Sequence, residues 1–292
     1  MEFRGTFTAL VTPFQNGEVD EEAYRRLIEW QIEEGVQGLV PCGTTGESAT
    51  LSHAEHKKVI KICVDQVKGR VPVLAGAGSN NTKEAIELTR DAKDSKADGA
   101  LLITPYYNKP TQHGLIEHFA ALAKEVSMPF IVYNVPGRTS VNLLPETLAE
   151  MKKRVPEVVG VKEATGNLEQ ISRVVEFCGP DFQVLSGDDF TALATFAIGG
   201  CGVISVASNV SPKKMSAMWT AYASGDLAGA RKLHYELAPL FRAMFLETNP
   251  VPAKTALSWM GKFPFETRLP MVPMLPANQE KLKAVLTGCG LL

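Results

Sequence analysis

The chain has 292 residues, of which 45% are hydrophobic and 21% charged, and its 30 basic and 32 acidic side chains give a formal net charge of −2. This is an ordinary globular composition, and the absence of a basic cluster interleaved with aromatics argues against a nucleic acid partner. The five cysteines are scattered and never form a Cys-x-x-Cys pair, which argues against a disulfide framework or a thiolate metal site. We therefore expect a protein of the reducing cytoplasm.

No segment predicts export or a membrane span. The first six residues lack the basic and apolar regions of a signal peptide. The long uncharged run at 190–212 is interrupted by Gly199, Gly200 and Gly202. It therefore predicts a buried helix that leads into a buried strand, and we expect no membrane partner.

Short apolar runs recur along the chain at the spacing of βα units. They are continuously apolar, as in strands covered on both faces. Their starts are separated by roughly 20 to 35 residues, and we count about eight: Thr6–Val11, Gly38–Pro41, Val71–Ala75, Ala100–Ile103, Phe130–Tyr133, Val158–Val161, Gln183–Leu185 and Val203–Val206. Helical patterns lie between them, including 21–34, a capping box from Ser52 to Glu55, and 82–97.

This alternation predicts an α/β fold, most economically a (β/α)₈ TIM barrel, although an open doubly wound sheet alternates in the same way. Strand patterns stop near residue 224. Beyond it, 227–246, 252–260 and 278–286 have helical patterns, separated by a proline-rich stretch at 263–276. We expect a catalytic barrel of residues 1–224 and a C-terminal helical domain of residues 225–292.

A barrel of this kind places its chemistry on the loops that follow the strands. Five polar segments end or directly follow predicted strands and should share one rim: Gly43–Glu47, Tyr106–Asn108, Tyr133–Asn134, Lys162–Glu163 and Ser186–Asp188.

Lys162 ends the apolar run 158–161, where we expect its ammonium group to be partly desolvated. Desolvation lowers a lysine pKa from about 10.4 toward neutrality, and a neutral amine attacks a ketone to form a Schiff base. Iminium chemistry also needs hydroxyls that move protons, and Thr44, Tyr107 and Tyr133 are available on the rim. The alternative is structural: a solvated lysine, a threonine that caps a turn and tyrosines of the core.

Two other motifs are incomplete. Gly76 to Asn81 follows a strand like a dinucleotide fingerprint, but Asn81 replaces the third glycine and no clear acidic partner follows. His53 and His56 are three residues apart and lack the spacing of a zinc protease helix. We expect neither a metal nor a cofactor.

Five motifs in the chain match those of a known protein family, and the resemblance extends from the first predicted strand to the final Gly-Leu-Leu. They are Gly43-Thr44-Thr45-Gly46-Glu47-Ser48, Pro105-Tyr106-Tyr107-Asn108-Lys109-Pro110, Tyr133-Asn134-Val135-Pro136-Gly137-Arg138-Thr139, Gly160-Val161-Lys162-Glu163-Ala164 and Ser186-Gly187-Asp188-Asp189. With them the chain resembles the dihydrodipicolinate synthase family. The wider group of pyruvate-dependent class I aldolases includes N-acetylneuraminate lyase and 2-keto-3-deoxygluconate aldolase.

The resemblance implies a lyase that condenses pyruvate with L-aspartate 4-semialdehyde, the first committed step of the diaminopimelate route to lysine. It implies that Lys162 forms the Schiff base and that Tyr133, Thr44 and Tyr107 relay protons, with Tyr107 reaching into a neighbouring subunit. It further implies a homo-oligomer, expected to be a tetramer built as a dimer of dimers. The substrate-binding residues that it implies are Thr45 for the pyruvate carboxylate, Arg138 for the aldehyde substrate's carboxylate, and Gly187 and Ile204 as pocket lining.

A second set of residues matches the family's inhibitory site for free lysine at the dimer interface. Asn80 and Glu84, four residues apart, and His53 and His56, three apart, have the spacing of pairs on one helix face. The structural alternative is that Asn80 caps a helix and that the histidines are solvated. The whole set implied by the resemblance is Ser48, Ala49, His53, His56, Asn80, Glu84 and Tyr106.

Two further functions compete with this interpretation. A sugar-acid aldolase of the same group needs side chains that pair with many hydroxyls, whereas a short amino-acid aldehyde needs a carboxylate clamp such as Arg138. A non-catalytic barrel that senses lysine or pyruvate has no need of the complete lysine, tyrosine and threonine set.

Overall fold

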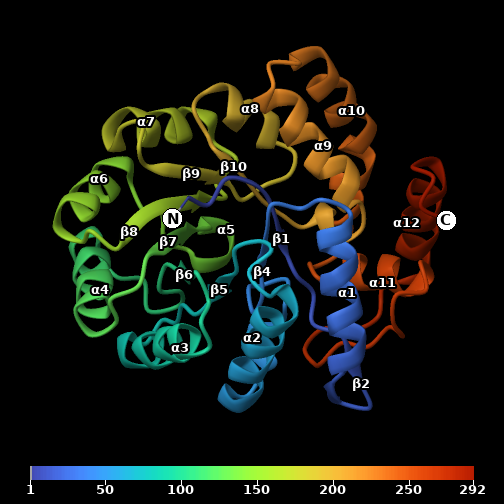
Figure 1. The fold of residues 1–292 in the computed structure, drawn as a ribbon, viewed down its shortest axis with the longest axis horizontal. Coiled ribbons are helices and arrows are strands. Elements are labelled where there is room, and N and C mark those ends of the chain that lie inside the picture. The colour runs from blue at the N-terminus through green and yellow to red at the C-terminus, as the bar shows by residue number, and fades with distance from the viewer. Residues whose placement is uncertain (1) are drawn as a thin grey trace.

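The computed structural model describes residues 2–292, and its centre is a closed barrel of eight parallel strands (Figure 1). The strands run in the order β4-β1-β10-β9-β8-β7-β6-β5, and a parallel bridge between Leu39 and Val73 closes the ring between β4 and β5. Their bounds are β1 Gly5–Ala9, β4 Gly38–Val40, β5 Leu74–Gly76, β6 Gly99–Ile103, β7 Phe130–Asn134, β8 Val158–Glu163, β9 Gln183–Ser186 and β10 Gly202–Ser205. The predicted (β/α)₈ barrel is confirmed, and the open sheet is excluded because the ring closes.

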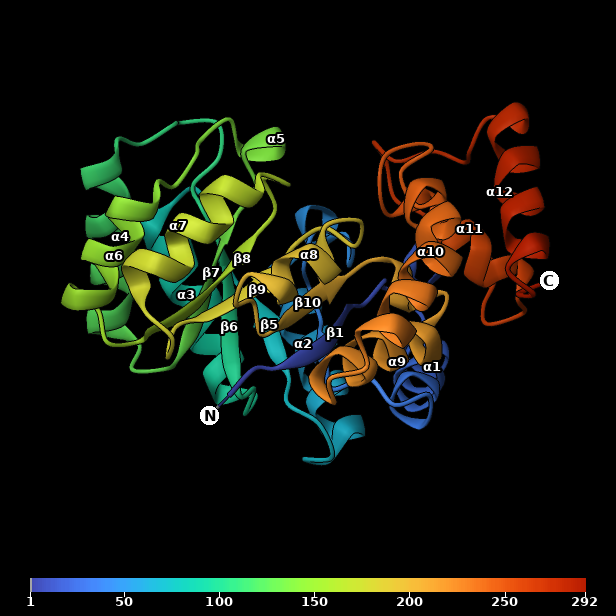
Figure 2. The ribbon, with the colours of Figure 1, turned by 90° about the horizontal axis from the view of Figure 1, so that it is seen from above.

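Helices surround the strands (Figures 1 and 2). The capping box predicted at Ser52 is present at the start of the second helix, with reciprocal bonds between Ser52 and Glu55. Asp20 similarly caps the first helix by accepting a hydrogen bond from the Ala23 N–H. The helices of the barrel are α1 Glu21–Glu33, α2 His53–Val67, α3 Thr82–Asp94, α4 Gln112–Glu125, α5 Pro136–Thr139, α6 Pro145–Arg154, α7 Leu168–Cys178, α8 Ala192–Ala197 and α9 Pro212–Ala223, with short 3₁₀ turns η1 Ser48–Thr50 and η2 Ala207–Asn209.

Alternate residues of each strand face opposite sides, so each strand contributes to two cores. In β6, Leu101 belongs to the cluster inside the barrel, whereas Ala100 and Leu102 pack outward against the helices. The interior cluster is small and includes Phe7, Ile131 and other side chains of the strands. These side chains pack together inside the barrel.

Three helices follow the barrel: α10 Leu227–Ala243, α11 Val251–Trp259 and α12 Pro276–Gly288. They lie at the opposite side of the molecule from α4 and α6 (Figures 1 and 2). Leu237, Leu257 and Leu286 of these helices belong to the same buried cluster as Tyr24 and Val59 of α1 and α2. The division of the chain at residue 224 into two domains stays a prediction.

Two local features differ from the sequence analysis. A two-residue hairpin, β2 Phe14–Gln15 and β3 Glu18–Val19, follows β1 and was not predicted, because strands this short have no measurable periodicity. Asn80 and Glu84 do not share a helix face, since α3 begins at Thr82 and its cap is Asn81.

Among residues 2–292, no helix is both long and apolar enough to span a membrane.

Candidate active site

Lys162 lies at the carboxyl end of β8, directly beside Tyr133 of β7 in the strand register. Only 6% of Lys162 is exposed, and its Nζ lies 4.1 Å from the centre of the Tyr133 ring. The pKa of Lys162 is lowered to about 7, mainly by burial; the Asp189 carboxylate acts to raise this pKa, and the nearby Arg138 charge acts to lower it. A substantial fraction of this amine is therefore neutral, and nucleophilic, near pH 7.

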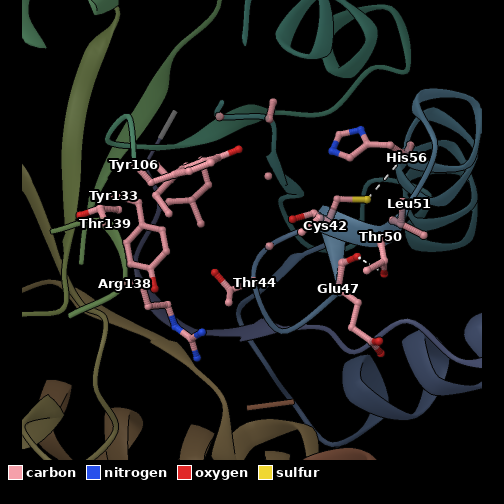
Figure 3. Close-up of a pocket in the computed structure, with 18 of the residues that line it drawn as sticks. Cys42, Thr44, Glu47, Thr50, Leu51, His56, Tyr106, Tyr133, Arg138 and Thr139 are labelled. Atoms are coloured by element: carbon pink, nitrogen blue, oxygen red, sulfur yellow. Dashed lines mark hydrogen bonds between the residues drawn. The ribbon is translucent and has the colours of Figure 1, made fainter. Parts of the chain in front are cut away.

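Tyr133, Thr44 and Arg138 face one another across the pocket (Figure 3). Tyr133 is buried, and burial raises the pKa of its hydroxyl, while the charge of Arg138 and the side chain of Thr44 lower it. The Tyr133 hydroxyl is therefore protonated at neutral pH and has a partner with which to exchange a proton. Arg138 reaches the pocket from α5, a short helix that begins with Pro136 immediately after β7.

Thr44 and Thr45 belong to a tight turn after β4. The N–H of Gly46 donates to the carbonyl of Gly43 at 3.0 Å, and the N–H of Glu47 donates to the carbonyl of Thr44 at 3.1 Å. Thr45 is buried, and its hydroxyl accepts a hydrogen bond of 2.9 Å from the Asn249 side chain. Asn249 lies between α10 and α11 and was not predicted as a site residue, since no local pattern marks it.

A cavity of about 240 Å³ surrounds Lys162. Gly187 contributes to its wall, and a Cβ there would lie 2.5 Å from the Cβ of Ala164, so a side chain is not tolerated. Ile204 is fully buried in the interior cluster with Tyr133 and is not part of the wall. The predicted residues on the wall are Thr44, Thr45, Tyr133, Arg138, Lys162 and Gly187.

A larger cavity of about 780 Å³ adjoins the first and shares Thr44, Tyr133 and Arg138 with it. Six of the seven residues predicted to bind lysine line it, together with Tyr107: Ser48, Ala49, His53, His56, Glu84 and Tyr106. Asn80 does not line it; its carbonyl accepts a hydrogen bond from the side chain of Asn108.

The larger cavity has an acidic end. Glu84 accepts hydrogen bonds from Ser79 and from His53, the latter at 3.0 Å, and the Ser79 bond is the main reason that the pKa of Glu84 is lowered. His56 is buried with its Nδ1 unpartnered within the described residues, and burial lowers its pKa. A carboxylate and a histidine therefore line space that a small cation with further polar groups can fill.

Two buried carboxyl groups lie where strands end, Glu163 at the end of β8 and Asp189 after β9. Asp189 accepts the N–H groups of Val206 and Ala207, and burial raises its pKa to about 6. Glu163 accepts hydrogen bonds from the side chains of Asn134 and Gln170.

Among residues 2–292, no group of three histidine, cysteine or acidic side chains is placed to hold a metal ion.

A family model described as the dihydrodipicolinate synthetase family matches residues 2–288. The chain belongs to this family. A 4-hydroxy-tetrahydrodipicolinate synthase of Nitratidesulfovibrio vulgaris (strain DSM 19637 / Miyazaki F) is 70% identical over 292 residues, which is 100% of both chains. The family predicted from the five motifs is therefore confirmed.

Solved members of the dihydrodipicolinate synthetase family have the same fold. A dihydrodipicolinate synthase from Acinetobacter baumannii, complexed with pyruvate, aligns with a TM-score of 0.97 and 42% identity over 99% of each chain. The enzyme from Cyanidioschyzon merolae, with lysine bound, aligns with a TM-score of 0.96 and 39% identity, again over 99% of each chain.

Proposed function

We propose that the chain condenses pyruvate with L-aspartate 4-semialdehyde to give 4-hydroxy-tetrahydrodipicolinate, the first committed step of the diaminopimelate route to lysine. The observation that carries the proposal is the buried amine of Lys162, with its pKa lowered to about 7, beside Tyr133 in a cavity of about 240 Å³. The synthase relatives support this reaction over cleavage of a sugar acid.

The reaction begins when neutral Lys162 attacks the ketone carbon of pyruvate. The carbinolamine loses water to give an iminium, which withdraws electrons from the neighbouring methyl group. The methyl group then loses a proton, and the resulting enamine is the carbon nucleophile. Tyr133 and Thr44, which face the same space, are the hydroxyls that carry these protons, with Tyr107 of a neighbouring subunit as the third.

The enamine adds to the aldehyde carbon of the second substrate. The substrate's own amine then attacks the iminium carbon, displaces Lys162 by transimination and closes the ring. Thr45 holds the pyruvate carboxylate by its hydroxyl, and Arg138 pairs with the carboxylate of the semialdehyde through its planar guanidinium. No cofactor takes part in these steps.

Turnover of the purified protein with the two substrates, coupled to an NADPH-dependent dihydrodipicolinate reductase, tests the reaction. Consumption of NADPH that requires both substrates is the expected result. A folded protein that shows no turnover with these substrates, but cleaves N-acetylneuraminate or 2-keto-3-deoxygluconate, would contradict it.

The rate of Schiff base formation should depend on pH through Lys162. Only the neutral amine attacks, so the rate should rise with pH, reach half of its maximum near the pKa of about 7, and level off above it. The carboxylate of Asp189 raises this pKa, so Asp189→Asn should move the midpoint to lower pH. Borohydride trapping of pyruvate across the pH range measures both midpoints, and an unmoved midpoint would show that Asp189 does not act on the amine.

Tyr107 supports the proposal that the active assembly is an oligomer, a tetramer built as a dimer of dimers. It is 90% exposed, with a left-handed φ of 68°, on the rim of the larger cavity. If Tyr107 serves the partner's site, co-expressed Tyr107→Phe and Lys162→Ala subunits should form mixed dimers with one complete site. Activity should then return to about a quarter of the wild-type value, whereas a tyrosine that serves its own site would restore none.

We also propose that free L-lysine binds in the larger cavity and inhibits turnover, with Glu84 opposite an ammonium group of the ligand. Millimolar L-lysine should inhibit, and Glu84→Ala should raise the half-inhibitory concentration about tenfold or more with kcat unchanged. Glu87→Ala removes an exposed carboxylate from the same helix and is the matched control. Equal inhibition of both variants would place the inhibitor elsewhere.

A further inference from the structure

The turn that carries Thr44 and Thr45 is tied to the C-terminal segment by a buried ion pair. The Nζ of Lys254, in α11, lies 2.6 Å from Oε1 of Glu47, in the turn. The two side chains are 0% and 3% exposed. Most ion pairs in this protein lie at the surface, where solvent weakens them, so this pair is set apart by its burial.

Glu47 is joined to the catalytic turn through its own backbone. Its N–H donates to the carbonyl of Thr44, and its backbone is left-handed with a φ of 54°, which is uncommon for a residue with a side chain. Its second carboxylate oxygen accepts the N–H of Arg268 at 3.3 Å. Both oxygens of the side chain are therefore held by the C-terminal segment while the backbone closes the turn.

Lys254 is equally fixed. Its Nζ lies 4.3 Å from the centre of the Phe14 ring, and the guanidinium of Arg268 lies 4.4 Å from the same ring. The amine of Lys254 is thus paired with the Glu47 carboxylate and also lies over an aromatic face.

Asn249, five residues before Lys254, makes a second contact between the C-terminal segment and the turn. Its side-chain amide donates to the hydroxyl of Thr45, and both residues line the cavity around Lys162. A hydroxyl has a single hydrogen. Because the Asn249 bond occupies a lone pair of the Thr45 oxygen, that hydrogen remains available to donate to an anionic ligand in the cavity.

We propose that Glu47 and Lys254 are positioning residues, which together with Asn249 hold the Thr44–Thr45 turn in the geometry that binds pyruvate. The proposal rests on the function proposed above. A hydrophobic pair of similar volume would stabilise the fold about as well as a buried ion pair, whereas a charged pair also fixes direction and distance. The effect of this pair should therefore appear in substrate binding as well as in stability.

The decisive variant is the double substitution Glu47→Gln with Lys254→Met, which leaves neither charge buried without a partner. Each single variant keeps one buried charge without its partner, so we expect it to unfold at a lower temperature than the double variant. In the folded double variant, the pyruvate concentration that gives half-maximal borohydride trapping should rise about tenfold, the loss expected when a hydrogen bond to a charged group is misplaced.

A purely structural role predicts a different result. Loss of folded protein lowers the amount of trapped adduct but leaves the half-saturating pyruvate concentration unchanged. Met151→Ala creates a cavity under α6, outside both site cavities, and should lower the melting temperature without moving that concentration. A half-saturating concentration within twofold of the wild type in the double variant overturns the inference. Failure of the wild-type protein to trap pyruvate overturns the proposed function, and this inference with it.

Discussion

Replacement of Lys162 by alanine should lower kcat by about 10⁴-fold or more and abolish borohydride trapping of pyruvate. No iminium can form without the amine, so the pyruvate methyl group keeps its proton and no enamine is produced. The side chain is buried at the end of β8, and burial holds its pKa near 7. A water molecule in its place cannot form an iminium with pyruvate. Mass spectrometry of the borohydride-treated protein and the coupled turnover assay measure the two effects.

Two controls make this result specific to the neutral amine. Lys162→Arg keeps a positive charge that cannot be lost near neutral pH, so it should be as inactive as the alanine variant. Lys152→Ala removes the amine of α6 that donates to the Cys178 carbonyl, away from both cavities, and should retain full trapping. Turnover by Lys162→Ala within tenfold of the wild-type value, or a trapped adduct on another lysine, would rule out the proposed chemistry.

Replacement of Tyr133 by phenylalanine should lower kcat by about 10² to 10⁴-fold with a much smaller change in KM for pyruvate. The hydroxyl faces Thr44 and Arg138 and, in the proposed reaction, moves protons between intermediates, whereas the ring remains to pack beside the Lys162 side chain. Steady-state kinetics with both substrates separates the two parameters.

A matched substitution separates the chemical effect of the Tyr133 hydroxyl from the general effect of removing a buried tyrosine hydroxyl. Tyr24→Phe removes another buried hydroxyl, on α1, and should leave kcat unchanged. Thr44→Val should also lower kcat. The double variant Thr44→Val with Tyr133→Phe should lose less kcat than the product of the two single losses, because both substitutions interrupt the same proton relay. A Tyr133→Phe enzyme with wild-type kcat, or with a change confined to KM, would assign the tyrosine to binding alone.

The barrel and most of the site were predictable because they depend on local order along the chain. Apolar runs at the spacing of βα units give the strands, and closure of about eight parallel strands gives the barrel. In such a barrel every strand ends at the same rim, which is why Thr44, Tyr133 and Lys162 were expected to meet, and all three line one cavity. The desolvation of Lys162 also follows from its position at the end of an apolar strand.

Other features depend on pairs that no local pattern marks. Asn249 contacts Thr45 across 204 residues, and Lys254 contacts Glu47 across 207. The position of Asn80 outside α3 follows from the cap at Asn81, one residue away, which spacing alone did not distinguish. The sequence by itself determined the repeating strands, the family and the side chains that end each strand. Only the tertiary structure decided which residues of the C-terminal segment contact the turn of Thr44 and Thr45, because that choice is made by packing between segments that are distant in the chain.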